Sequence, residues 1–164
     1  MQTMHSTLPR PPASAPAYVR RPNALVLALL RLGVPMGPNT LLTVRGRTSG
    51  QPRTVPVAVT EADGRRWVIG AYGDVNWVRN LRAAGGGEVV LDGRPTKVMA
   101  TELDQTEAEW FFQDIVGPYL RRLPRILQVL VRALFRHLAP DMLTDPALAA
   151  RKRPVFELFA SDSA

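Results

Sequence analysis

The sequence predicts an α+β fold in which a small antiparallel β-barrel is flanked by helices, and three observations support this prediction. First, short segments of alternating apolar residues are separated by turn sequences, of which Asp63-Gly64 and Asp92-Gly93 are the strongest hairpin signals. Second, helix-like segments stand between and around these hairpins instead of following every strand, which favours an antiparallel barrel over a parallel α/β sheet. Third, a chain of 164 residues can bury roughly 70% of its unfolded surface, so it needs neither disulfides nor a metal to fold.

Five or six strands are expected, most of them paired through hairpins. The alternation of β-branched residues is clearest in residues 53–60, and the two Asp-Gly turns each join one expected strand to the next. The expected strands are residues 40–45, 53–60, 66–72, 88–91, 95–103 and 154–159.

Helices are expected where apolar residues recur with a helical period after a capping residue. Asp74 is a suitable N-cap for a helix that Gly85 would end, and Thr106 with Glu109 forms a capping box if Thr106 is the cap. Pro124 is expected to bend the longest helix. The expected helices are residues 24–32, 75–84, 106–116, 119–138 and a short one near 146–151.

Composition divides the chain into an arm and one domain. Residues 1–22 hold five prolines among small residues and cannot bury a core, so a flexible arm is expected there. Residues 23–164 are expected to form a single domain that begins with a helix and carries a helical insertion at about 105–151. No run of about 18 apolar residues occurs, and residues 25–30 are too short for a convincing signal peptide. The expected location is therefore the cytoplasm.

Charge and side-chain chemistry narrow the function. The chain has 21 Lys+Arg against 14 Asp+Glu, and this net charge of +7 favours an anionic partner: nucleic acid, an anionic membrane or a polyanionic small molecule. Codon bias in a GC-rich genome is an alternative explanation for the excess of arginine. The absence of cysteine excludes disulfide frameworks, thiolate metal sites and cysteine nucleophiles. With only His5 and His137 available, a histidine metal site or a Ser-His-Asp triad is not expected.

The expected turn at residues 46–50 has the composition of an anion site. It holds two glycines and two hydroxyls, and Arg45, Arg47 and Arg53 lie in or beside it. Glycines allow backbone N–H groups to approach an anion, and arginine matches phosphate or carboxylate oxygens in pairs. If the turn keeps the register of the strands, simple alternation places the three arginines on one face, where they suit a ligand with several negative charges. The alternative interpretation is a solvated hairpin tip.

The segment 74–82 is the second candidate. Asn76 and Asn80 stand at i and i+4 of the expected helix, and Trp77 and Leu81 share the adjacent face. A tryptophan beside two amides could form one wall of a pocket for a flat heterocycle. The alternative is a core tryptophan with a polar outer stripe.

Together these two segments resemble a known family. G-R-T-S-G-Q-P-R at 46–53 and N-W-V-R-N-L-R-A at 76–83 are similar to the motifs G-R-K-[ST]-G-x-P-R and W-x-x-N-L-R-A of the deazaflavin-dependent nitroreductase family of actinobacteria. The ending R-K-R-P-V-F-E-L at 151–158 resembles the terminal strand of its members. Two departures stand out: Thr48 takes the place of the usual lysine, and the segment before Trp77 is short.

The resemblance implies a split β-barrel related to FMN-binding barrels, with coenzyme F420 as cofactor and FMN as the alternative. It implies an oxidoreductase that uses reduced F420 to transfer hydride to a small organic acceptor: a quinone, a nitro compound or an activated alkene. The alternatives are a non-catalytic barrel that binds a flavin-like cofactor or a lipophile and, less expected, a nucleic-acid-binding protein. The cofactor residues implied by the resemblance are Arg47, Thr48, Ser49, Gly50, Arg53, Pro56, Ala71, Asn76, Trp77 and Asn80.

A hydride transfer to an acceptor also calls for a proton. Tyr72, at the end of an expected strand, and Tyr119, at the start of the longest expected helix, are the candidate donors, and water is the alternative. No metal is expected.

The expected helix 119–138 combines a basic stripe with an apolar face. Arg121, Arg125, Arg132 and Arg136 follow a helical spacing, which is typical of a helix lying on an anionic membrane. The same helix could instead cover the substrate site or pack on the core with a solvated charged face. A nucleic-acid partner is not expected, because the aromatic residues do not interleave with the basic ones. The sequence leaves the oligomeric state open.

Overall fold

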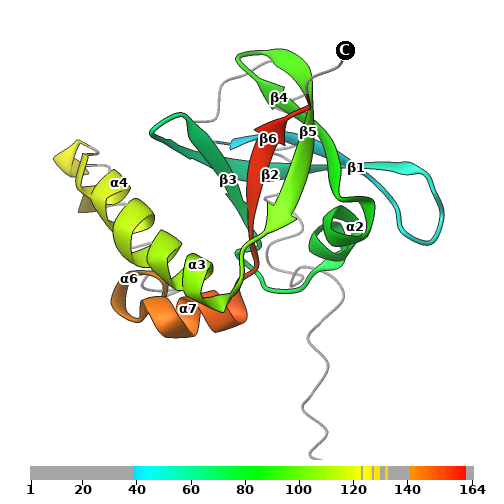
Figure 1. Cartoon of the computed structure of the whole chain (residues 1–164). Helices are drawn as coiled ribbons and strands as arrows, with labels where there is room; N and C mark the ends of the chain where they lie inside the picture. Colours follow the sequence, from blue (N-terminus) through cyan, green and yellow to red (C-terminus); the bar gives the residue numbers. More distant parts are fainter. Residues whose placement is uncertain (1–38, 123, 127, 130–131, 133–140, 162–164) are drawn as a thin grey trace, which may run out of the picture.

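Six antiparallel strands close into a barrel in the computed structural model, which describes residues 39–122, 124–126, 128–129, 132 and 141–161 (Figure 1). Neighbouring strands follow the order β1-β2-β3-β6-β5-β4, and β4 pairs with β1 to close the barrel. This architecture confirms the predicted α+β fold, a split β-barrel with flanking helices. The strands are β1 (Asn39–Arg45), β2 (Pro52–Ala62), β3 (Arg65–Ile69), β4 (Gly86–Leu91), β5 (Arg94–Glu102) and β6 (Val155–Ala160).

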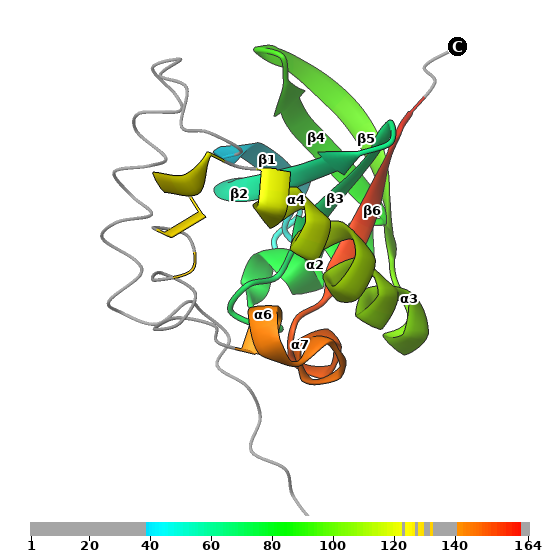
Figure 2. The ribbon, with the colours of Figure 1, turned by 90° about the vertical axis from the view of Figure 1, so that its left-hand side faces the viewer.

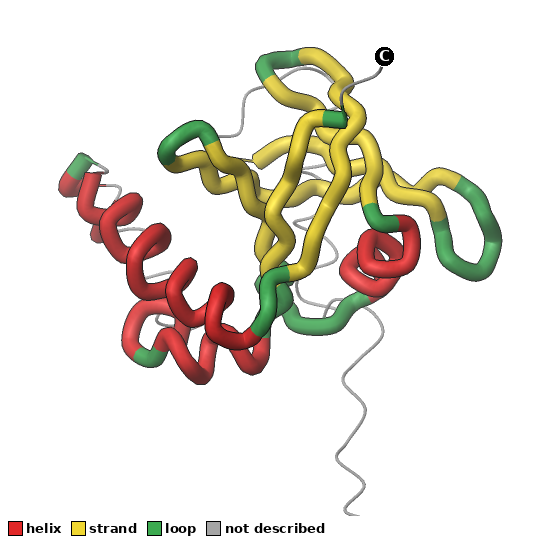
Figure 3. Tube along the Cα trace, viewed as in Figure 1, coloured by secondary structure: helices red, strands yellow, loops and turns green. Residues whose placement is uncertain are grey.

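The helices lie in two places around the barrel (Figures 1 and 3). One helix, α2, connects β3 to β4, whereas a rod formed by α3, η1 and α4 lies beside α6 and α7 on another side (Figure 2). The rod is continuous, with a π-helical stretch, η1, in its middle. Their bounds are α2 (Asn76–Ala84), α3 (Gln105–Trp110), η1 (Phe111–Val116), α4 (Gly117–Arg122), α6 (Asp141–Thr144) and α7 (Pro146–Lys152).

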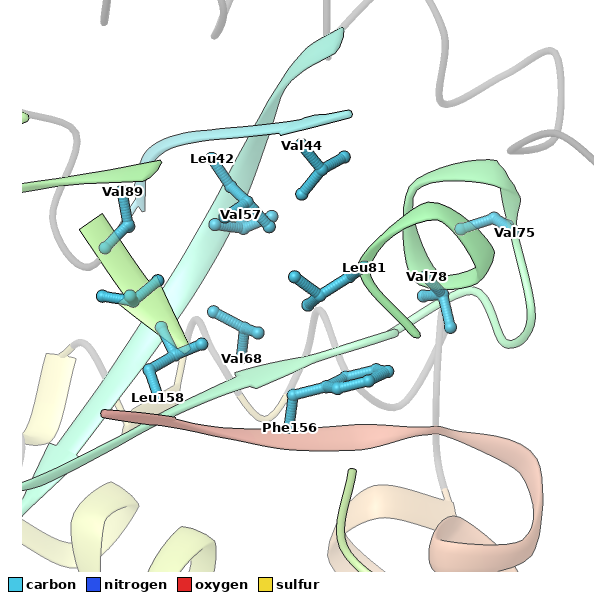
Figure 4. Packing of buried hydrophobic residues seen from close by; sticks show 11 residues of the cluster. Leu42, Val44, Val57, Val68, Val75, Val78, Leu81, Val89, Phe156 and Leu158 are labelled. Atoms are coloured by element: carbon cyan, nitrogen blue, oxygen red, sulfur yellow. The ribbon is translucent and has the colours of Figure 1, made fainter. Parts of the chain in front are cut away.

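The barrel interior is a core of mostly aliphatic side chains with Phe156 among them, and α2 contributes to it (Figure 4). Leu42 and Val44 of β1 point inward because alternate residues of a strand face opposite sides. Val78 and Leu81, three positions apart on α2, meet them and are fully buried. Burial of a side chain such as Leu81 stabilises the fold by about 1.5–3 kcal/mol. The core therefore fixes the position of α2, and with it the second sequence motif, against the barrel.

A second core covers the outer face of β3 and β6. Trp67 points away from the barrel interior, since its neighbour Val68 points in, and it packs against Phe111 at a ring-centroid distance of 5.4 Å. Arg65 lies over the ring of Trp67, with its guanidinium carbon 5.1 Å from the centroid. The helical rod is thereby attached to β3, the strand that leads into the loop before α2.

The tight turns agree with the sequence prediction. Asp63 and Gly64 have φ of 51° and 74°, and Asp92 and Gly93 have φ of 49° and 75°, as the predicted two-residue hairpin turns require. Barrel closure depends on Gly87, since a Cβ there would lie 2.6 Å from the carbonyl oxygen of Thr43 on β1. The two strands can approach only because this position lacks a side chain.

Two predicted helix caps were wrong. Asp74 does not cap α2, whose N-cap is Val75 without a side-chain bond. Thr106 is not a cap either: Asp104 accepts the backbone N–H of Glu107, whose side chain accepts the backbone N–H of Asp104. Asp74 instead pairs with Arg79 and Arg82, and the capping box of α3 begins two residues before the predicted one.

The helices after residue 104 also differ from the prediction. The expected helix 106–116 and the start of the expected helix 119–138 are joined in one rod over residues 105–122. Pro124 is not helical, but the described residues 125, 126, 128, 129 and 132 beyond it are, so the predicted interruption of the longer helix at Pro124 is present. The predicted arm at 1–22, the expected helix 24–32 and residues 133–138 lie outside the described residues. Within the part that is described, no helix is long and apolar enough to cross a membrane.

Candidate functional site

The connection between β1 and β2 forms a compact turn that projects from the barrel on the side of α2 (Figure 1). The backbone N–H of Gly46 donates to the carbonyl of Gln51 at 2.8 Å, and the N–H of Gly50 donates to the carbonyl of Gly46 at 2.8 Å. Gly50 has φ of 66°, a left-handed conformation that glycine adopts at low cost. Among the described residues, the N–H groups of Thr48 and Ser49 have no partner, so this turn exposes two donors at its tip.

Arg47 joins this turn to α2. The backbone N–H and the Nη1 group of Arg47 both donate to Oδ1 of Asn80, at 3.2 and 2.9 Å. Asn80 is only 7% exposed, so its carbonyl is held in place by the surrounding core. One contact thus brings together the two segments singled out in the sequence, which lie 33 positions apart.

The other arginines of α2 are engaged in internal ion pairs. Asp74 accepts from Nε of Arg79 at 2.9 Å and from Nη1 of Arg82 at 2.8 Å, and Arg82 also binds Glu102 on β5. Burial alone would raise the pKa of the Asp74 carboxyl, but the hydrogen bonds from Arg82 and Arg79 outweigh it and lower this pKa. These two arginines stabilise the entry to α2 and are less available to a ligand than Arg47.

A buried ion pair holds the loop between β3 and α2. Nε of Arg153 donates to the carbonyl oxygen of Ala71 at 3.2 Å, while its two terminal nitrogens donate to the carboxylate of Asp141. Gly70 donates to the carbonyl of Pro154 at 2.7 Å, which fixes the same loop to the start of β6. The sequence analysis missed Arg153 and Asp141, because no spacing or motif connects a loop residue with two positions after residue 140.

The β1–β2 turn does not keep the register that would place all three arginines on one face. Arg45 stands opposite Pro52 and Val44 stands opposite Arg53 in the β1–β2 ladder. Opposite residues of an antiparallel pair share a face, so Arg45 and Arg53 lie on opposite faces. Arg53 shares the inward face of Val44 at the end of the barrel, where its Cγ lies close to Gly46.

The remaining predicted residues are spread around α2 and the neighbouring strands. Pro56 lies on the outer face of β2, opposite Leu41. Trp77 is partly buried and packs against the interior core, as in the alternative interpretation. Asn76, Ala71 and Tyr72 are exposed, and Tyr119 belongs to α4, with its side chain outside the described residues.

Comparison with known proteins decides the family. The model of the F420H(2)-dependent quinone reductase family matches residues 18–121, which include both motifs. The chain belongs to this family. No curated protein matches the chain.

Solved structures with similar folds include an F420-H2 dependent reductase, FDR-A, with 23% identity over 74% of this chain and 94% of that one and a TM-score of 0.48. A protein related to general stress protein 26, of the pyridoxinephosphate oxidase family, from Clostridium acetobutylicum has 12% identity over 83% of this chain and 82% of that one, with a TM-score of 0.42.

Membership in the F420H(2)-dependent quinone reductase family makes coenzyme F420 the cofactor. F420 is a deazaflavin with a phosphate and an oligoglutamate tail, so a matching site must offer hydrogen-bond donors and positive charge. The unpartnered N–H groups of Thr48 and Ser49, the guanidinium of Arg47 and the nearby Arg53 offer both. The donor set of this turn therefore fits the anionic part of the cofactor.

Proposed function

We propose that this F420-dependent oxidoreductase passes a hydride from the reduced cofactor to a small organic acceptor, with a quinone as the first class to test. A nitro compound and an activated alkene are the other classes. The observation that carries the proposal is the contact of Arg47 with Asn80, because it joins the β1–β2 turn, with its unpartnered N–H groups, to the helix that carries Trp77 and Asn76. Phosphate and ring of one cofactor can then be held by adjacent parts of the fold.

Each part of this site has a separate task in the proposal. The turn binds the phosphate and the first carboxylates of the tail, and the loop and helix beyond it position the ring. Asn80 has two proposed roles: it lies on the ring side, and its buried carbonyl orients Arg47 on the phosphate side. The residues proposed for the phosphate and tail are Arg47, Thr48, Ser49, Gly50 and Arg53; those proposed for the ring are Pro56, Ala71, Asn76, Trp77 and Asn80.

In this proposal the protein positions the cofactor and the acceptor and stabilises their charges, and it supplies no nucleophile. When bound, reduced F420 supplies the hydride. The reduced acceptor then needs a proton, and Tyr72, 36% exposed in the loop that Arg153 holds, is the proposed donor on this side of α2. Tyr119 is the second proposed donor, and water reaching the exposed loop is the alternative. Among the described residues there is no group of side chains that could hold a metal ion.

Binding of the cofactor is the first test. Titration of the protein with F420 and, separately, with FMN, followed by fluorescence, is expected to give micromolar or tighter binding of F420 and weaker binding of FMN. Oxidation of bound, reduced F420 by a soluble quinone, a nitroaromatic compound and an activated alkene then ranks the acceptors. Failure of both cofactors to bind at micromolar concentration would contradict the proposal.

A single substitution tests the turn. Arg53→Ala is expected to weaken F420 binding by about 1.5–3 kcal/mol, the scale of a hydrogen bond to a charged group, or roughly 10- to 150-fold in Kd. Arg66→Ala is the matched control, because Arg66 pairs with Glu61 on the surface of the β2–β3 hairpin. Equal affinities of the two variants and the unmodified protein would remove Arg53 from the site.

A further inference from the structure

The helical rod over residues 105–122 keeps one face on the surface of the molecule (Figure 2). Its other face, which includes Phe111, Ile115 and Leu120, packs into the second core. Exposed residues recur every three or four positions along the free side, as in an amphipathic helix. The surface that they form, the rod stripe, consists of Glu107, Trp110, Gln113, Asp114, Arg121 and Arg122.

Charge along the rod stripe changes sign from one end to the other. Glu107 and Asp114 precede Arg121 and Arg122, and none of the four has an ion pair within 4.0 Å of another described residue. One carboxylate oxygen of Glu107 accepts a backbone N–H in the capping box of α3. Nη1 of Arg121 lies 3.6 Å from the place that a Cβ would take on Gly117, so this guanidinium lies along the stripe. These charges can therefore pair with a molecule outside the protomer.

An aromatic side chain lies between the charged residues of the stripe. Trp110 is 39% exposed, although its ring lies 6.5 Å from the ring of Trp67 and 5.5 Å from the guanidinium carbon of Arg65. A large aromatic side chain that its neighbours already hold loses little entropy on binding, and tryptophan is frequent among the residues that anchor protein interfaces. The stripe thus combines an apolar anchor with two ends of opposite charge.

We propose that two copies of this chain associate through the rod stripe, with the rods antiparallel about a two-fold axis near Asp114. Glu107 and Arg121 each lie seven positions from Asp114, so the axis brings each glutamate opposite the arginine of the other copy. Trp110 and the half-buried Pro118 each lie four positions from Asp114, so each indole faces a proline ring. The two Asp114 carboxylates meet at the axis and oppose the association.

The size of the stripe sets the strength of this association. A helix with about 1.5 Å rise per residue gives the rod a length of about 25 Å and, with side chains, a width of about 10–12 Å. Two such faces in contact bury less than the roughly 800 Å² per partner of a stable interface. A reversible dimer is therefore expected, with a Kd on the order of 100 µM at low ionic strength.

This inference does not depend on the proposed function. The β1–β2 turn projects on the side of α2, whereas the rod lies on another side of the barrel (Figure 1). F420 is therefore expected to bind the monomer and the dimer equally well, and failure of either proposal leaves the other standing.

Sedimentation equilibrium of the full chain, from about 5 to 300 µM at low and at high salt, measures the association. The dimer is expected to weaken at high salt, because exposed ion pairs are screened. Glu107→Gln, which retains the capping box, and Arg121→Gln are each expected to raise Kd about two- to thirtyfold, since each removes two exposed ion pairs from a two-fold dimer. Asp114→Asn is expected to lower Kd, because it removes the repulsion at the axis.

Two charge-reversal variants test the pairing directly. Glu107→Lys sets two cations against each other and Arg121→Glu sets two carboxylates against each other, so neither variant is expected to self-associate. An equal mixture of the two is expected to form a heterodimer, because one native and one reversed ion pair then connect the copies. Arg94→Gln is the control and is expected to leave Kd unchanged, since it removes an exposed arginine at the β4–β5 turn.

The outcomes decide the inference. A chain that stays monomeric to about 300 µM at low salt, or a dimer that the rod variants do not change, overturns it. A mixture of the two charge-reversal variants that fails to associate also overturns it. If Asp114→Asn and Glu107→Gln change Kd in the same direction, the excess positive charge of the whole chain explains both changes, and the two-fold arrangement about Asp114 is wrong.

Discussion

The buried pair of Asp141 and Arg153 offers a stringent test, because it joins the helical layer to the loop of the proposed site. Both side chains are nearly inaccessible, 10% exposed for Asp141 and 8% for Arg153. Arg153 donates to both carboxylate oxygens and also to the carbonyl of Ala71. Asp141→Ala would leave a buried guanidinium with the Ala71 carbonyl as its one remaining partner among these contacts.

The expected loss follows from this geometry. Removing one member of a buried pair typically costs about 3–5 kcal/mol, because the remaining charge stays desolvated. Asp141→Ala and Arg153→Met are each expected to destabilise the fold by this amount. The double variant is expected to lose less than the sum of the two, since neither charge is then left alone. Arg66→Met, which breaks the surface pair with Glu61, is the matched control and is expected to cost at most about 1 kcal/mol.

The contribution of Asp141 also has a defined pH dependence. Burial alone would raise the pKa of its carboxyl, but the hydrogen bond from Arg153 and the nearby positive charges outweigh this and lower the pKa. A group with a lowered folded-state pKa stabilises the fold above its unfolded value of about 3.9, and the effect is lost as the pH falls through the folded pKa. The stability difference between the unmodified protein and Asp141→Ala is therefore expected to be constant near pH 7 and to shrink below about pH 4.

Urea unfolding from pH 7 downward measures these differences, and F420 titration of the same variants measures the effect on the loop. Because Arg153 also binds the carbonyl of Ala71, Arg153→Met is expected to weaken F420 binding under conditions in which it remains folded. A loss of stability no larger than that of Arg66→Met would refute the reasoning. An Asp141→Ala difference that grows as the pH falls would refute the sign of the pKa argument.

Three further substitutions probe how the fold is closed and supported. Gly87→Ala is expected to cost about 1–3 kcal/mol in thermal denaturation, since its Cβ would lie 2.6 Å from the Thr43 carbonyl oxygen; an unchanged Tm would contradict this. Glu157→Gln removes the charge of a paired contact at 2.6 Å to Arg65, whose side chain is 48% exposed, so a loss of about 1 kcal/mol that shrinks in high salt is expected; a salt-independent loss would argue against an electrostatic origin. Asp104→Ala removes the capping box of α3 and is expected to lower the free energy of unfolding, measured in urea, by about 1 kcal/mol. An unchanged free energy of unfolding would show that the cap does not stabilise the fold.

Local signals in the sequence were sufficient to predict the hairpins of the barrel. The Asp63-Gly64 and Asp92-Gly93 turns have the predicted backbone, and the alternation of 53–60 lies within β2. The arginine face was wrong because the β1–β2 register, which sets the pairing of Arg45 with Pro52, depends on how the longer turn closes. Alternation within one strand does not reveal that closure.

The candidate site could be predicted in part. Arg47 and Asn80 were both singled out, although their contact across 33 positions needed the fold. The role of Arg153 could not be predicted from the sequence, because it depends on contacts with Asp141 and with the backbone carbonyl of Ala71. Every residue has a backbone carbonyl, so no sequence pattern indicates which one an arginine will bind.

The excess of positive charge is divided between cations that form ion pairs within the fold and cations that do not. Among the described residues, ion pairs engage arginines of β3, α2 and the chain just before β6, where they hold elements together. Arg45 and Lys97 have no such pair in this part of the chain, and they line a groove of about 620 Å³ that extends from Gly50 in the β1–β2 turn to Met99 on β5. Unpaired cations on one surface raise the local concentration of an anionic ligand and speed its association, an effect that salt screens. The association rate of F420 is therefore expected to fall steeply with ionic strength, and Arg45→Gln and Lys97→Gln should each flatten that dependence, whereas Arg66→Gln, on the β2–β3 hairpin, should not.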